Sequence, residues 1–392
     1  MPQYQYLIVG GGMTADAAAR GIREVDPNAA IGLVGAEKDA PYARPPLSKA
    51  LWKGAPLESV WRNTSEVAVD LHLGRRVTAL DLNAKRIVDD RGTDYTFDKL
   101  LLATGGTPRH LPLGGEHVIY FRTLQDYRRL RELADQRKTF AVIGGGFIGS
   151  EIAAALAMQG CGVAMLFPES GIGARVFPAD LAQALVDYYR EKGVDARPGE
   201  RVTGVSEQGT QIVVRTASGL RLTVDAVVAG IGITPNVDLA EAAGLAADDG
   251  IVVDEHLGTT HPDVFAAGDV ARFSAPQLGT RIRVEHEDNA LSMGRAAGRA
   301  MAGDRTRYDH LPFFYSDLFE RGYEAVGETD PRGETVADWK EEFVEGVVYY
   351  LSGGRIRGVL LWNTWGQVDA ARAFIRQPGP FEARDLKGRL PA

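Results

Sequence analysis

Short apolar runs, glycine turns and helical stretches recur in the same order at two places along the chain. The run Tyr4–Val9, rich in branched and aromatic residues, precedes three glycines and an alanine-rich stretch with helical character, Met13–Val25. The run Thr139–Ile143 likewise precedes three glycines and a helical stretch, Ser150–Gln159. This order is typical of a strand, a turn and a helix. The repeat therefore predicts two copies of one α/β unit.

The repeat extends beyond the glycine turns to a whole module. Each copy continues into a second short strand, a loosely alternating hairpin and a buried apolar strand. In the first copy these segments are Ile31–Val34, Val77–Asp81, Arg86–Val88, Tyr95–Thr96 and Lys99–Ala103; in the second they are Gly162–Phe167, Arg201–Val205, Gln211–Thr216, Leu220–Val224 and Ala226–Ala229. We therefore expect two Rossmann-type α/β domains.

The composition changes after about Asp309, where aromatic residues and segments with strand character become frequent. Strands are expected at Phe313–Tyr315, Tyr323–Val326, Phe343–Leu351 and Ile356–Trp362, and a helix at Gln367–Ile375. This part predicts a third, smaller α+β domain.

The two glycine turns have the spacing that suits a nucleotide diphosphate. The first, Gly10–Ala15, reads Gly-x-Gly-x-x-Ala, and the second, Gly144–Gly149, reads Gly-x-Gly-x-x-Gly. Such a loop needs a tight turn, then a residue without a side chain, so that backbone N–H groups reach the diphosphate. A small residue must then let helix and strand pack closely. One loop is a weak signal, but two copies in matching contexts predict two bound dinucleotides.

A carboxylate after the second strand of such a unit usually binds the ribose hydroxyls. The second copy supplies Glu169, and the first supplies Glu37, although Ala36 stands immediately before it. The alternative for either glutamate is a solvated loop carboxylate. We expect the ribose role at both.

Composition narrows the class of protein. The 392 residues carry 44 Lys and Arg against 52 Asp and Glu, a formal charge of −8, which argues against nucleic acid or an anionic membrane as the main partner. The single cysteine, Cys161, excludes an active-site dithiol or a thiolate metal site within the chain, and the scattered histidines show no metal-ligand spacing. No apolar stretch approaches the roughly 20 residues of a membrane span, and we expect a cytoplasmic enzyme.

Two further segments indicate the class of enzyme. Thr104–Arg109 closes one buried strand, and Val264–Asp269 closes another. With the glycine loops they resemble the two-dinucleotide flavoprotein reductases, in which the second segment places its aspartate against the ribityl chain of FAD. The stretch Pro41–Lys49 resembles the branch that contains the ferredoxin reductases of oxygenase systems and the apoptosis-inducing factors. Other branches carry a redox cysteine or dithiol there, whereas this chain carries none.

The C-terminal part resembles that of the apoptosis-inducing factors, on the segments Leu311–Leu318, Gly322–Gly327 and Leu361–Asn363. The whole resemblance covers the chain from Tyr4 to about Ile375. Three residues depart from the pattern. Ala36 replaces an expected acid, Glu287 replaces the tryptophan of the ferredoxin reductases, and Tyr315 replaces another tryptophan.

The resemblance implies a fold, a division into domains and a set of site residues. Two glutathione-reductase-like Rossmann domains are expected, an FAD-binding domain at 1–112 and 239–310 and an NAD-binding domain at 113–238, followed by a C-terminal α+β domain at 311–392. The residues implied for FAD are Gly10, Gly12, Ala15, Glu37, Arg44, Lys49, Thr104, Gly105, Asp269, Glu285, His286 and Tyr315. Those implied for NADH are Gly144, Gly146, Gly149, Glu169, Arg175 and Gly232, although Arg175 could instead be a surface arginine.

Three residues are candidates for the chemistry. The resemblance places Lys49 and Glu151 as a pair beside the flavin N5, where a cation would stabilise charge on reduced flavin and its carboxylate partner would compensate that cation. The alternative is two ordinary residues at helix starts. The matching histidine in the apoptosis-inducing factors lies near the flavin and nicotinamide, which makes His286 the third candidate. A hydrogen-bonded loop histidine is the competing interpretation.

The expected reaction is hydride transfer from NADH to FAD, followed by electron transfer to a one-electron acceptor. A small ferredoxin or rubredoxin, or a quinone, would fit, because the chain has no dithiol. The alternative is a redox sensor like the apoptosis-inducing factors. Its NADH-reduced charge-transfer state would change conformation or form a homodimer to bind a partner. Glu287 and the C-terminal resemblance favour this alternative.

Overall fold

The computed structural model describes residues 1–112 and 117–390. The chain forms two compact units, each built from separate stretches of sequence. The first contains residues 1–44, 57–107 and 234–312, and the second contains residues 45–56, 108–233 and 313–390. The chain crosses from one unit to the other five times, and two of the crossings fall in the short strands β7 (Gly106–Pro108) and β16 (Ile233–Pro235). The limits expected for the FAD-binding, NAD-binding and C-terminal domains remain a prediction.

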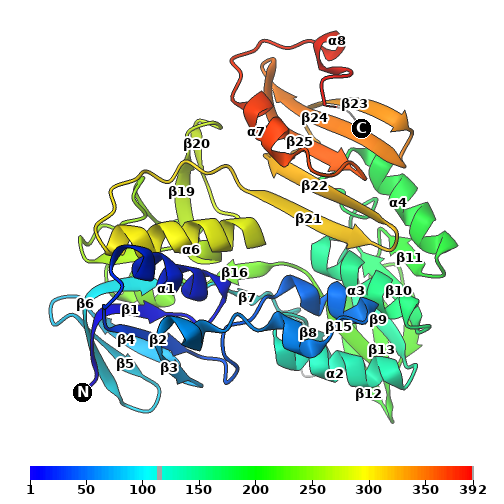
Figure 1. Ribbon diagram of the computed structural model, residues 1–392. Coiled ribbons are helices and arrows are strands. Elements are labelled where there is room, and N and C mark those ends of the chain that lie inside the picture. The colour runs from blue at the N-terminus through cyan, green and yellow to red at the C-terminus, as the bar shows by residue number, and fades with distance from the viewer. Residues whose placement is uncertain (113–116, 391–392) are drawn as a thin grey trace. The chain divides into compact units, whose positions relative to one another are not determined.

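The first unit is built on a seven-stranded sheet (Figure 1). Strands β3, β2, β1 and β6 lie side by side in parallel, β18 pairs with β6 in parallel, and β5 and β4 continue the sheet in antiparallel fashion. The bounds are β1 Gln3–Val9, β2 Ile31–Gly35, β3 Asp70–Leu73, β4 Val77–Asp81, β5 Arg86–Asp89, β6 Asp94–Leu102 and β18 Val264–Ala266.

Two helices of this unit, α1 (Met13–Val25) and α6 (Glu287–Met301), pack closely along each other (Figure 1). Glycines make the close approach possible. A Cβ at Gly298 would lie 2.0 Å from the carbonyl oxygen of Ala18, and one at Gly21 would lie 2.2 Å from that of Arg295. These distances are far below van der Waals contact, so the packing depends on residues without side chains.

The remaining elements of the first unit are short. They are α5 Asp238–Ala242, β17 Ile251–Val252, β19 Ala271–Ala275 and β20 Thr280–Ile282, with 3₁₀ turns at Leu57–Val60, Thr64–Val67 and Gly268–Val270. Strands β17, β19 and β20 form a small separate sheet.

The second unit contains a five-stranded, all-parallel sheet in the order β11-β10-β9-β15-β8. Its central strands are buried on both faces, which explains why β9 and β15 read as unbroken apolar runs. The bounds are β8 Val118–Tyr120, α2 Leu124–Asp135, β9 Thr139–Ile143, α3 Phe147–Met158, β10 Gly162–Phe167, α4 Ala179–Glu191, β11 Asp195–Pro198 and β15 Ala226–Ala229, with 3₁₀ turns at Pro45–Leu47 and Ala50–Lys53. An antiparallel sheet of β12 (Val202–Gln208), β13 (Gln211–Thr216) and β14 (Arg221–Val224) is inserted before β15.

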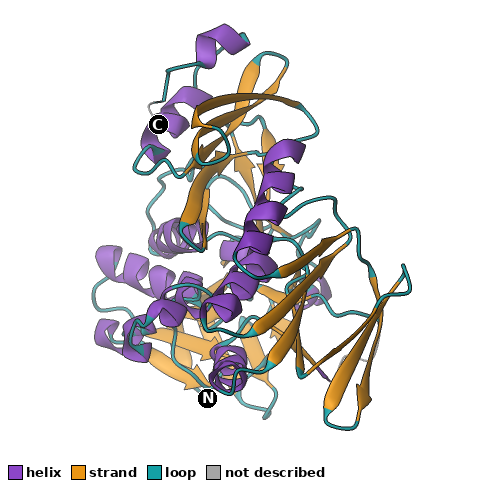
Figure 2. Cartoon of the chain, turned by 90° about the vertical axis from the view of Figure 1, so that its right-hand side faces the viewer, coloured by secondary structure: helices purple, strands orange, loops and turns teal. Residues whose placement is uncertain are grey.

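The C-terminal part of the second unit is a five-stranded antiparallel sheet in the order β21-β22-β25-β24-β23, flanked by helices (Figure 2). Helix α7 packs on β22 and β25. The bounds are β21 Phe313–Leu318, β22 Arg321–Gly327, β23 Glu334–Glu341, β24 Glu345–Ser352, β25 Arg355–Trp362, α7 Val368–Ile375 and α8 Ala383–Leu386. The predicted fold class is confirmed: two regions with parallel sheets and a C-terminal α+β region.

Some details of the predicted elements were wrong. The expected separate strands Tyr95–Thr96 and Lys99–Ala103 form the single strand β6. Its other neighbours, β5 and β18, pair with its two ends, but β1 pairs with it from Thr96 to Leu102 and joins them. The strand β23 was not predicted. It lies at the edge of its sheet, and most of its side chains are at least partly exposed, so its sequence lacks the apolar signal of a buried strand.

Within the described ranges, no helix is both long and apolar enough to cross a membrane. In the same ranges, no three His, Cys, Asp or Glu side chains are grouped in a way that could hold a metal ion.

Candidate functional site

The first glycine loop joins β1 to α1 and leaves the N-terminus of that helix open. Gly10 has a φ of +135°, and a Cβ there would lie 2.1 Å from the carbonyl oxygen of Ala103. Only glycine fits this turn. Gly12 is the N-cap of α1, where a Cβ would meet nothing within 4 Å, and Ala15 is fully buried. The loop therefore presents bare backbone at the positive end of the helix dipole, as a diphosphate requires.

The second glycine loop repeats this geometry between β9 and α3. Gly144 has a φ of +117°, and a Cβ there would lie 2.3 Å from the carbonyl oxygen of Gly230. Gly146 is the open N-cap of α3. A Cβ at Gly149 would lie 2.0 Å from the carbonyl oxygen of Gly144, so helix and loop touch backbone to backbone. Both loops thus fit the diphosphate of a dinucleotide.

Glu37 lies just beyond β2, at the edge of the sheet that carries the first glycine loop. Its Oε1 accepts a hydrogen bond from Arg44 Nη2 at 2.5 Å, and its Oε2 accepts one from the Tyr42 hydroxyl at 2.6 Å. Burial lowers the pKa of Arg44, but Tyr42, Glu37 and Asp269 more than offset it, so the pKa is raised. The predicted ribose carboxylate is therefore already oriented by two neighbours.

Asp269 and His286, which are 17 positions apart in the chain, lie in the same region of the first unit. Gly268, at φ +80°, packs against Thr14 of α1 and places Asp269 in the following 3₁₀ turn. His286 is the N-cap of α6. Burial lowers the pKa of His286 to about 4, against the opposite influence of Asp269 and Asp288, so its ring is neutral near pH 7. A neutral histidine can accept or donate one hydrogen bond but supplies no charge.

Three more predicted residues of the first unit have structural partners. Thr104 donates its hydroxyl to the Asn236 carbonyl, and the Asn236 side chain donates to the Thr104 carbonyl, each at 2.8 Å. The backbone N–H of Asn236 also donates to Gly105 at 2.9 Å. Glu285 accepts from Arg283 at 2.9 Å. Asn236, which the motif analysis did not select, fixes the loop after β6.

Glu169 and Arg175 form an ion pair beyond the end of β10. Both Nε and Nη2 of Arg175 donate to one carboxylate oxygen, Oε1, at 2.9 and 2.7 Å. The Arg175 side chain is 80% exposed, whereas that of Glu169 is 24% exposed. The loop between them is fastened to the second glycine loop, because the N–H of Gly173 donates to the carbonyl of Gly145. Glu169 therefore lies close to the site where a diphosphate would bind.

Lys49 and Glu151 meet in the second unit, where the carboxylate is buried. Lys49 Nζ lies 2.6 Å from Glu151 Oε1, and the side chains are 11% and 2% exposed. Two hydroxyls also donate to this carboxylate: Ser48 to Oε2 at 2.5 Å and Ser316 to Oε1 at 2.6 Å. The ring centroid of Tyr315 lies 5.2 Å from Lys49 Nζ. Sequence reasoning found the ion pair but missed both serines.

Two buried phenols lie near enough to the Glu151 carboxylate to be influenced by its charge. Burial raises the pKa of Tyr323 well above its usual value, and the charge of Glu151 adds to the effect. The same two causes raise the pKa of Tyr189. Both phenols are therefore neutral near pH 7 and add no second negative charge beside Glu151, which is paired with Lys49.

The site residues are divided between the two units. The first unit contains Gly10, Gly12, Ala15, Glu37, Arg44, Thr104, Gly105, Asp269, Glu285 and His286, and the second contains Lys49, Gly144, Gly146, Gly149, Glu151, Glu169, Arg175, Gly232 and Tyr315. Gly232 has a φ of +92°, and its carbonyl accepts a hydrogen bond from the N–H of Arg109.

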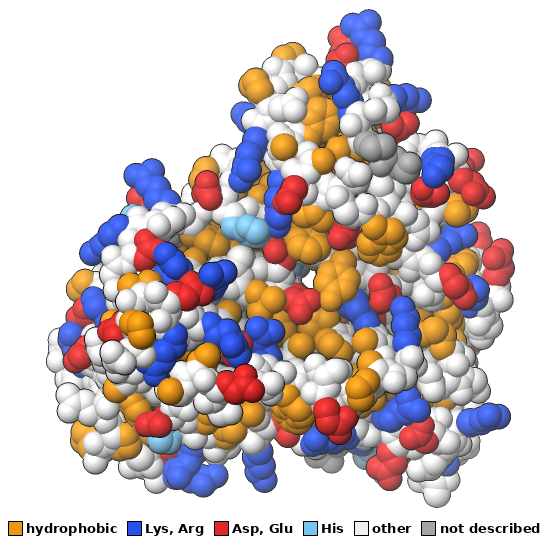
Figure 3. Space-filling model, viewed as in Figure 1, with side chains coloured by type: hydrophobic (Ala, Val, Ile, Leu, Met, Phe, Trp, Pro, Cys, Tyr) orange, Lys and Arg blue, Asp and Glu red, His pale blue; other side chains and the backbone are white. Residues whose placement is uncertain are grey.

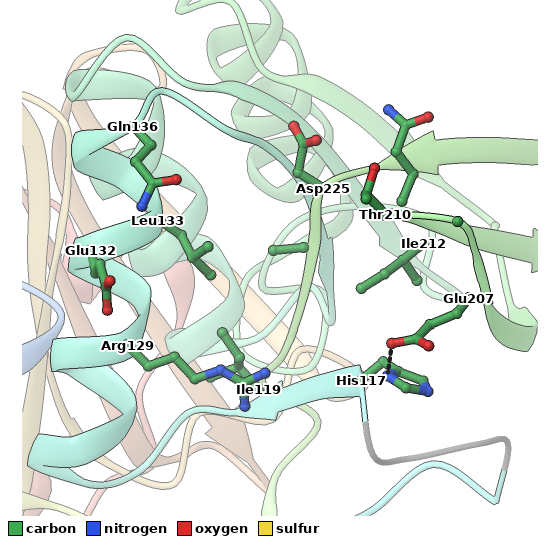
Figure 4. A pocket seen from close by; sticks show the side chains of 13 residues that line it. His117, Ile119, Arg129, Glu132, Leu133, Gln136, Glu207, Thr210, Ile212 and Asp225 are labelled. Carbon is green, nitrogen blue, oxygen red and sulfur yellow. Dashed lines mark ion pairs between the residues drawn. The ribbon is translucent and has the colours of Figure 1, made fainter.

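A hollow of about 390 Å³ lies elsewhere in the second unit, between α2 and the β12–β13 hairpin (Figure 4). Its wall includes Arg129, Leu133, Ile212 and the ion pair between His117 and Glu207. None of the predicted site residues lines it, so it is separate from the dinucleotide loops.

Comparison with protein families decides the class. The family described as pyridine nucleotide-disulphide oxidoreductase matches residues 4–294. The chain belongs to this family. As a pyridine nucleotide-disulphide oxidoreductase it is an FAD- and NADH-dependent oxidoreductase, and the glycine loops fit both dinucleotides. Its single cysteine, Cys161, is buried, so this family member has no dithiol of its own.

Relatives within the family match nearly the whole chain. Putidaredoxin reductase CamA of Pseudomonas putida is 34% identical, with 96% of this chain and 92% of the relative covered. Apoptosis-inducing factor 1, mitochondrial, of Dictyostelium discoideum is 32% identical, with 95% and 78% covered. The covalent putidaredoxin reductase–putidaredoxin complex contains a similar structure, with a TM-score of 0.90, 33% identity, and 98% of this chain and 95% of that chain covered.

Proposed function

We propose that this chain passes electrons from NADH through FAD to a small ferredoxin-type protein. The observation that carries the proposal is similarity over almost the full length to reductases of such proteins, one of them seen in complex with putidaredoxin. The single buried cysteine supports the same conclusion, because reduction of a disulfide by exchange needs an accessible thiolate. On the face shown in Figure 3, basic and acidic side chains are interspersed.

In this proposal the two units hold the two dinucleotides. The loop Gly10–Ala15 binds the diphosphate of FAD at the N-terminus of α1, with Glu37 on the adenosine ribose and Arg44 holding Glu37 in place. The loop Gly144–Gly149 binds the diphosphate of NADH in the same way, with Glu169 on its adenosine ribose. Bare glycine backbone at both N-caps supports this assignment.

Lys49 supplies positive charge to the redox centre. When bound, FAD accepts a hydride from NADH and releases the electrons one at a time. A buried ammonium stabilises the negative charge that develops. The ammonium itself must be paired with a carboxylate, because an uncompensated charge is costly to bury. The Lys49–Glu151 contact meets that requirement. His286, neutral near pH 7, acts as a hydrogen-bonding residue and not as a second cation.

Rapid mixing tests the proposal. The purified protein, loaded with FAD, is mixed anaerobically with NADH, then with putidaredoxin or with glutathione disulfide. We expect fast bleaching of the flavin by NADH, fast reoxidation by the ferredoxin and none by the disulfide. Failure of NADH to reduce the flavin, or preferential reduction of the disulfide, would contradict the proposal.

A redox sensor is the second candidate, and similarity to an apoptosis-inducing factor over 95% of this chain favours it. A sensor would keep its reduced, nucleotide-bound form for minutes and would change its oligomeric state with NADH. Light scattering during the same anaerobic titration separates the candidates, because a reductase reoxidised by ferredoxin would stay in one state. Cytoplasmic location, the absence of a nucleic-acid partner and a homodimer remain predictions from the sequence.

A further inference from the structure

Two separate segments of the second unit donate to one buried carboxylate on a third. Glu151, on α3, accepts from Lys49 and Ser48, which are neighbours in the 45–56 segment, and from Ser316 on β21. The two serines approach different oxygens, Ser48 at Oε2 and Ser316 at Oε1, so the ammonium of Lys49 shares Oε1 with Ser316. The carboxylate is therefore held from both sides.

This number of donors matters because the carboxylate lies away from water. A buried carboxylate needs hydrogen bonds to replace its lost hydration, and charged acceptors form the stronger bonds. With two hydroxyls in place, the negative charge of Glu151 is shared among three donors. The ammonium of Lys49 has three N–H groups, of which Glu151 Oε1 takes one. The serines thus limit how strongly the carboxylate draws Lys49 toward itself.

Packing contacts hold strand β21 in place around the hydrogen bond from Ser316 to Glu151. Ser316 pairs in the sheet with Tyr323 of β22, and the Tyr323 ring stacks on Trp362 with centroids 5.8 Å apart. Two residues before Ser316, Phe314 packs against Phe147 in the first turn of α3, with centroids 5.0 Å apart. The hydroxyl of Ser316 is therefore placed by packing of its neighbours on the same face of the sheet, where Phe314 also contacts Tyr323, and not by the hydrogen bond alone.

We propose that Ser316 and Ser48 are positioning residues, which act through Glu151 to set the position and charge field of the Lys49 ammonium. Ser316 makes the C-terminal sheet a contributor to the redox centre. The inference rests on the proposed function, in which Lys49 faces the developing charge. It adds that the two hydroxyls, and not the ion pair alone, set how well Lys49 performs that role.

A double-mutant cycle on the FAD-loaded protein tests the inference. Rapid mixing with NADH gives the rate of flavin reduction for wild type, Ser316→Ala, Lys49→Met and the double variant. We expect Ser316→Ala to slow reduction by about threefold to tenfold, the effect of losing part of a hydrogen bond to a charged group. In the Lys49→Met background the same change should alter the rate by less than about twofold, because the group through which it acts is gone.

A matched control separates this role from loss of a buried hydroxyl in general. Thr364, two residues after the end of β25, is also buried, and the acceptors of its hydroxyl are the carbonyls of Gly346 and Trp362 instead of Glu151. Thr364→Val should leave the rate of reduction and the flavin midpoint potential unchanged. Ser316→Ala and Ser48→Ala should both make the midpoint potential more negative, because a displaced ammonium stabilises the reduced flavin less.

The outcomes distinguish the inference from the function on which it rests. Wild type that NADH cannot reduce would refute the proposed function. Reducible wild type with an equal slowing by Ser316→Ala in both backgrounds, or with no slowing and no shift of potential, would overturn the inference alone. If Ser316→Ala loses FAD or fails to fold, Ser48→Ala in the same cycle decides, because it removes the donor to the other oxygen of Glu151.

Discussion

Glu169 uses only one of its carboxylate oxygens to hold Arg175. Both nitrogens of the arginine donate to Oε1, so Oε2 takes no part in the contact with Arg175. A carboxylate in this state can still accept from ribose hydroxyls. The arginine is mostly exposed and is therefore able to leave the pair when another anion competes.

Cofactor preference follows from this pair. The 2′-phosphate of NADPH would bring negative charge against Glu169, so we expect NADH to be preferred by roughly tenfold to a hundredfold. Glu169→Ser should improve flavin reduction by NADPH, because Arg175 is then released to bind the phosphate. Flavin reduction by each nucleotide is the measurement. Adding Arg175→Ala to Glu169→Ser should remove the gain; equal use of both nucleotides by wild type would show that Glu169 does not select the cofactor.

His286 makes stability depend on pH. Its pKa is about 4 in the folded protein against 6.5 ordinarily, so the unfolded chain binds its proton more readily. Its contribution is complete above pH 6.5 and is lost as the pH falls toward 4, by an amount on the order of 3 kcal/mol. The free energy of unfolding of wild type and His286→Gln, measured between pH 7 and 4, should therefore converge in acid. Parallel curves would mean that His286 is not buried in its neutral form.

At the scale of elements, the first turn of α3 joins several parts of the second unit. Its N-cap is the open glycine Gly146, its third residue Gly149 touches the loop backbone, and Glu151 follows two residues later. One helix thus carries both the diphosphate-binding end and the carboxylate of the ion pair. A change in its first turn should therefore affect nucleotide binding before it affects the remainder of the fold.

Gly149→Ala is the sharpest test of that helix. A methyl group would overlap the carbonyl oxygen of Gly144, 2.0 Å from the ideal Cβ, and must push helix and loop apart. We expect NADH to bind at least about tenfold more weakly while FAD is retained. Titration calorimetry with NADH measures this. Gly204→Ala in β12 is the control, since its nearest neighbour would lie 3.9 Å away; equal losses in both variants would argue against a special role for the loop.

The sequence predicted those elements whose signal is local. Strands β9 and β10 have the predicted bounds because parallel, doubly buried strands read as plain apolar runs. The start of α3 was placed three residues late, since its first turn is the glycine loop itself. Strand β6 was split because pairing on both sides, and not propensity, makes Asp94–Leu102 continuous.

The candidate site was predictable only in part, for a related reason. Lys49 and Glu151 were found through resemblance to a family, and the structure places them 2.6 Å apart. Ser48 and Ser316 lie in segments that carry the resemblance, Pro41–Lys49 and Leu311–Leu318, but nothing in those segments marks either serine as a partner of Glu151. Ser316 becomes significant only when β21 lies against α3, a contact between residues 165 positions apart in the chain. Spacing within a sequence cannot reveal a partner that tertiary packing supplies.

At the scale of the whole molecule, the cysteine count limits the acceptor. Cys161 is buried after α3, burial raises its thiol pKa, and its sulfur lies 3.6 Å from the carbonyl oxygen of Ala134. A thiol in this state is a poor nucleophile. The family name refers to disulphides, but this chain has no pair of thiols with which to exchange one.

Replacing the cysteine should therefore leave turnover unchanged. Cys161→Ser should retain NADH-driven ferredoxin reduction within about twofold, at a cost in stability of roughly 1 kcal/mol for a buried polar replacement. Steady-state rates and a melting curve give both quantities. Loss of most of the activity in a variant that still binds FAD would show that the thiol takes part in electron transfer.

Strand β21 has a consequence for engineering by recombination. Laboratories often exchange C-terminal domains between related enzymes to change the partner that an enzyme accepts. Here such an exchange would also replace the residue at Ser316, whose hydroxyl reaches Glu151 on α3. A donor domain with alanine or valine at that position would carry a defect in flavin reduction into the chimaera, whatever partner it recognised. A donor domain with serine at that position should leave flavin reduction intact. The residue at this one position should therefore distinguish compatible from incompatible donor domains.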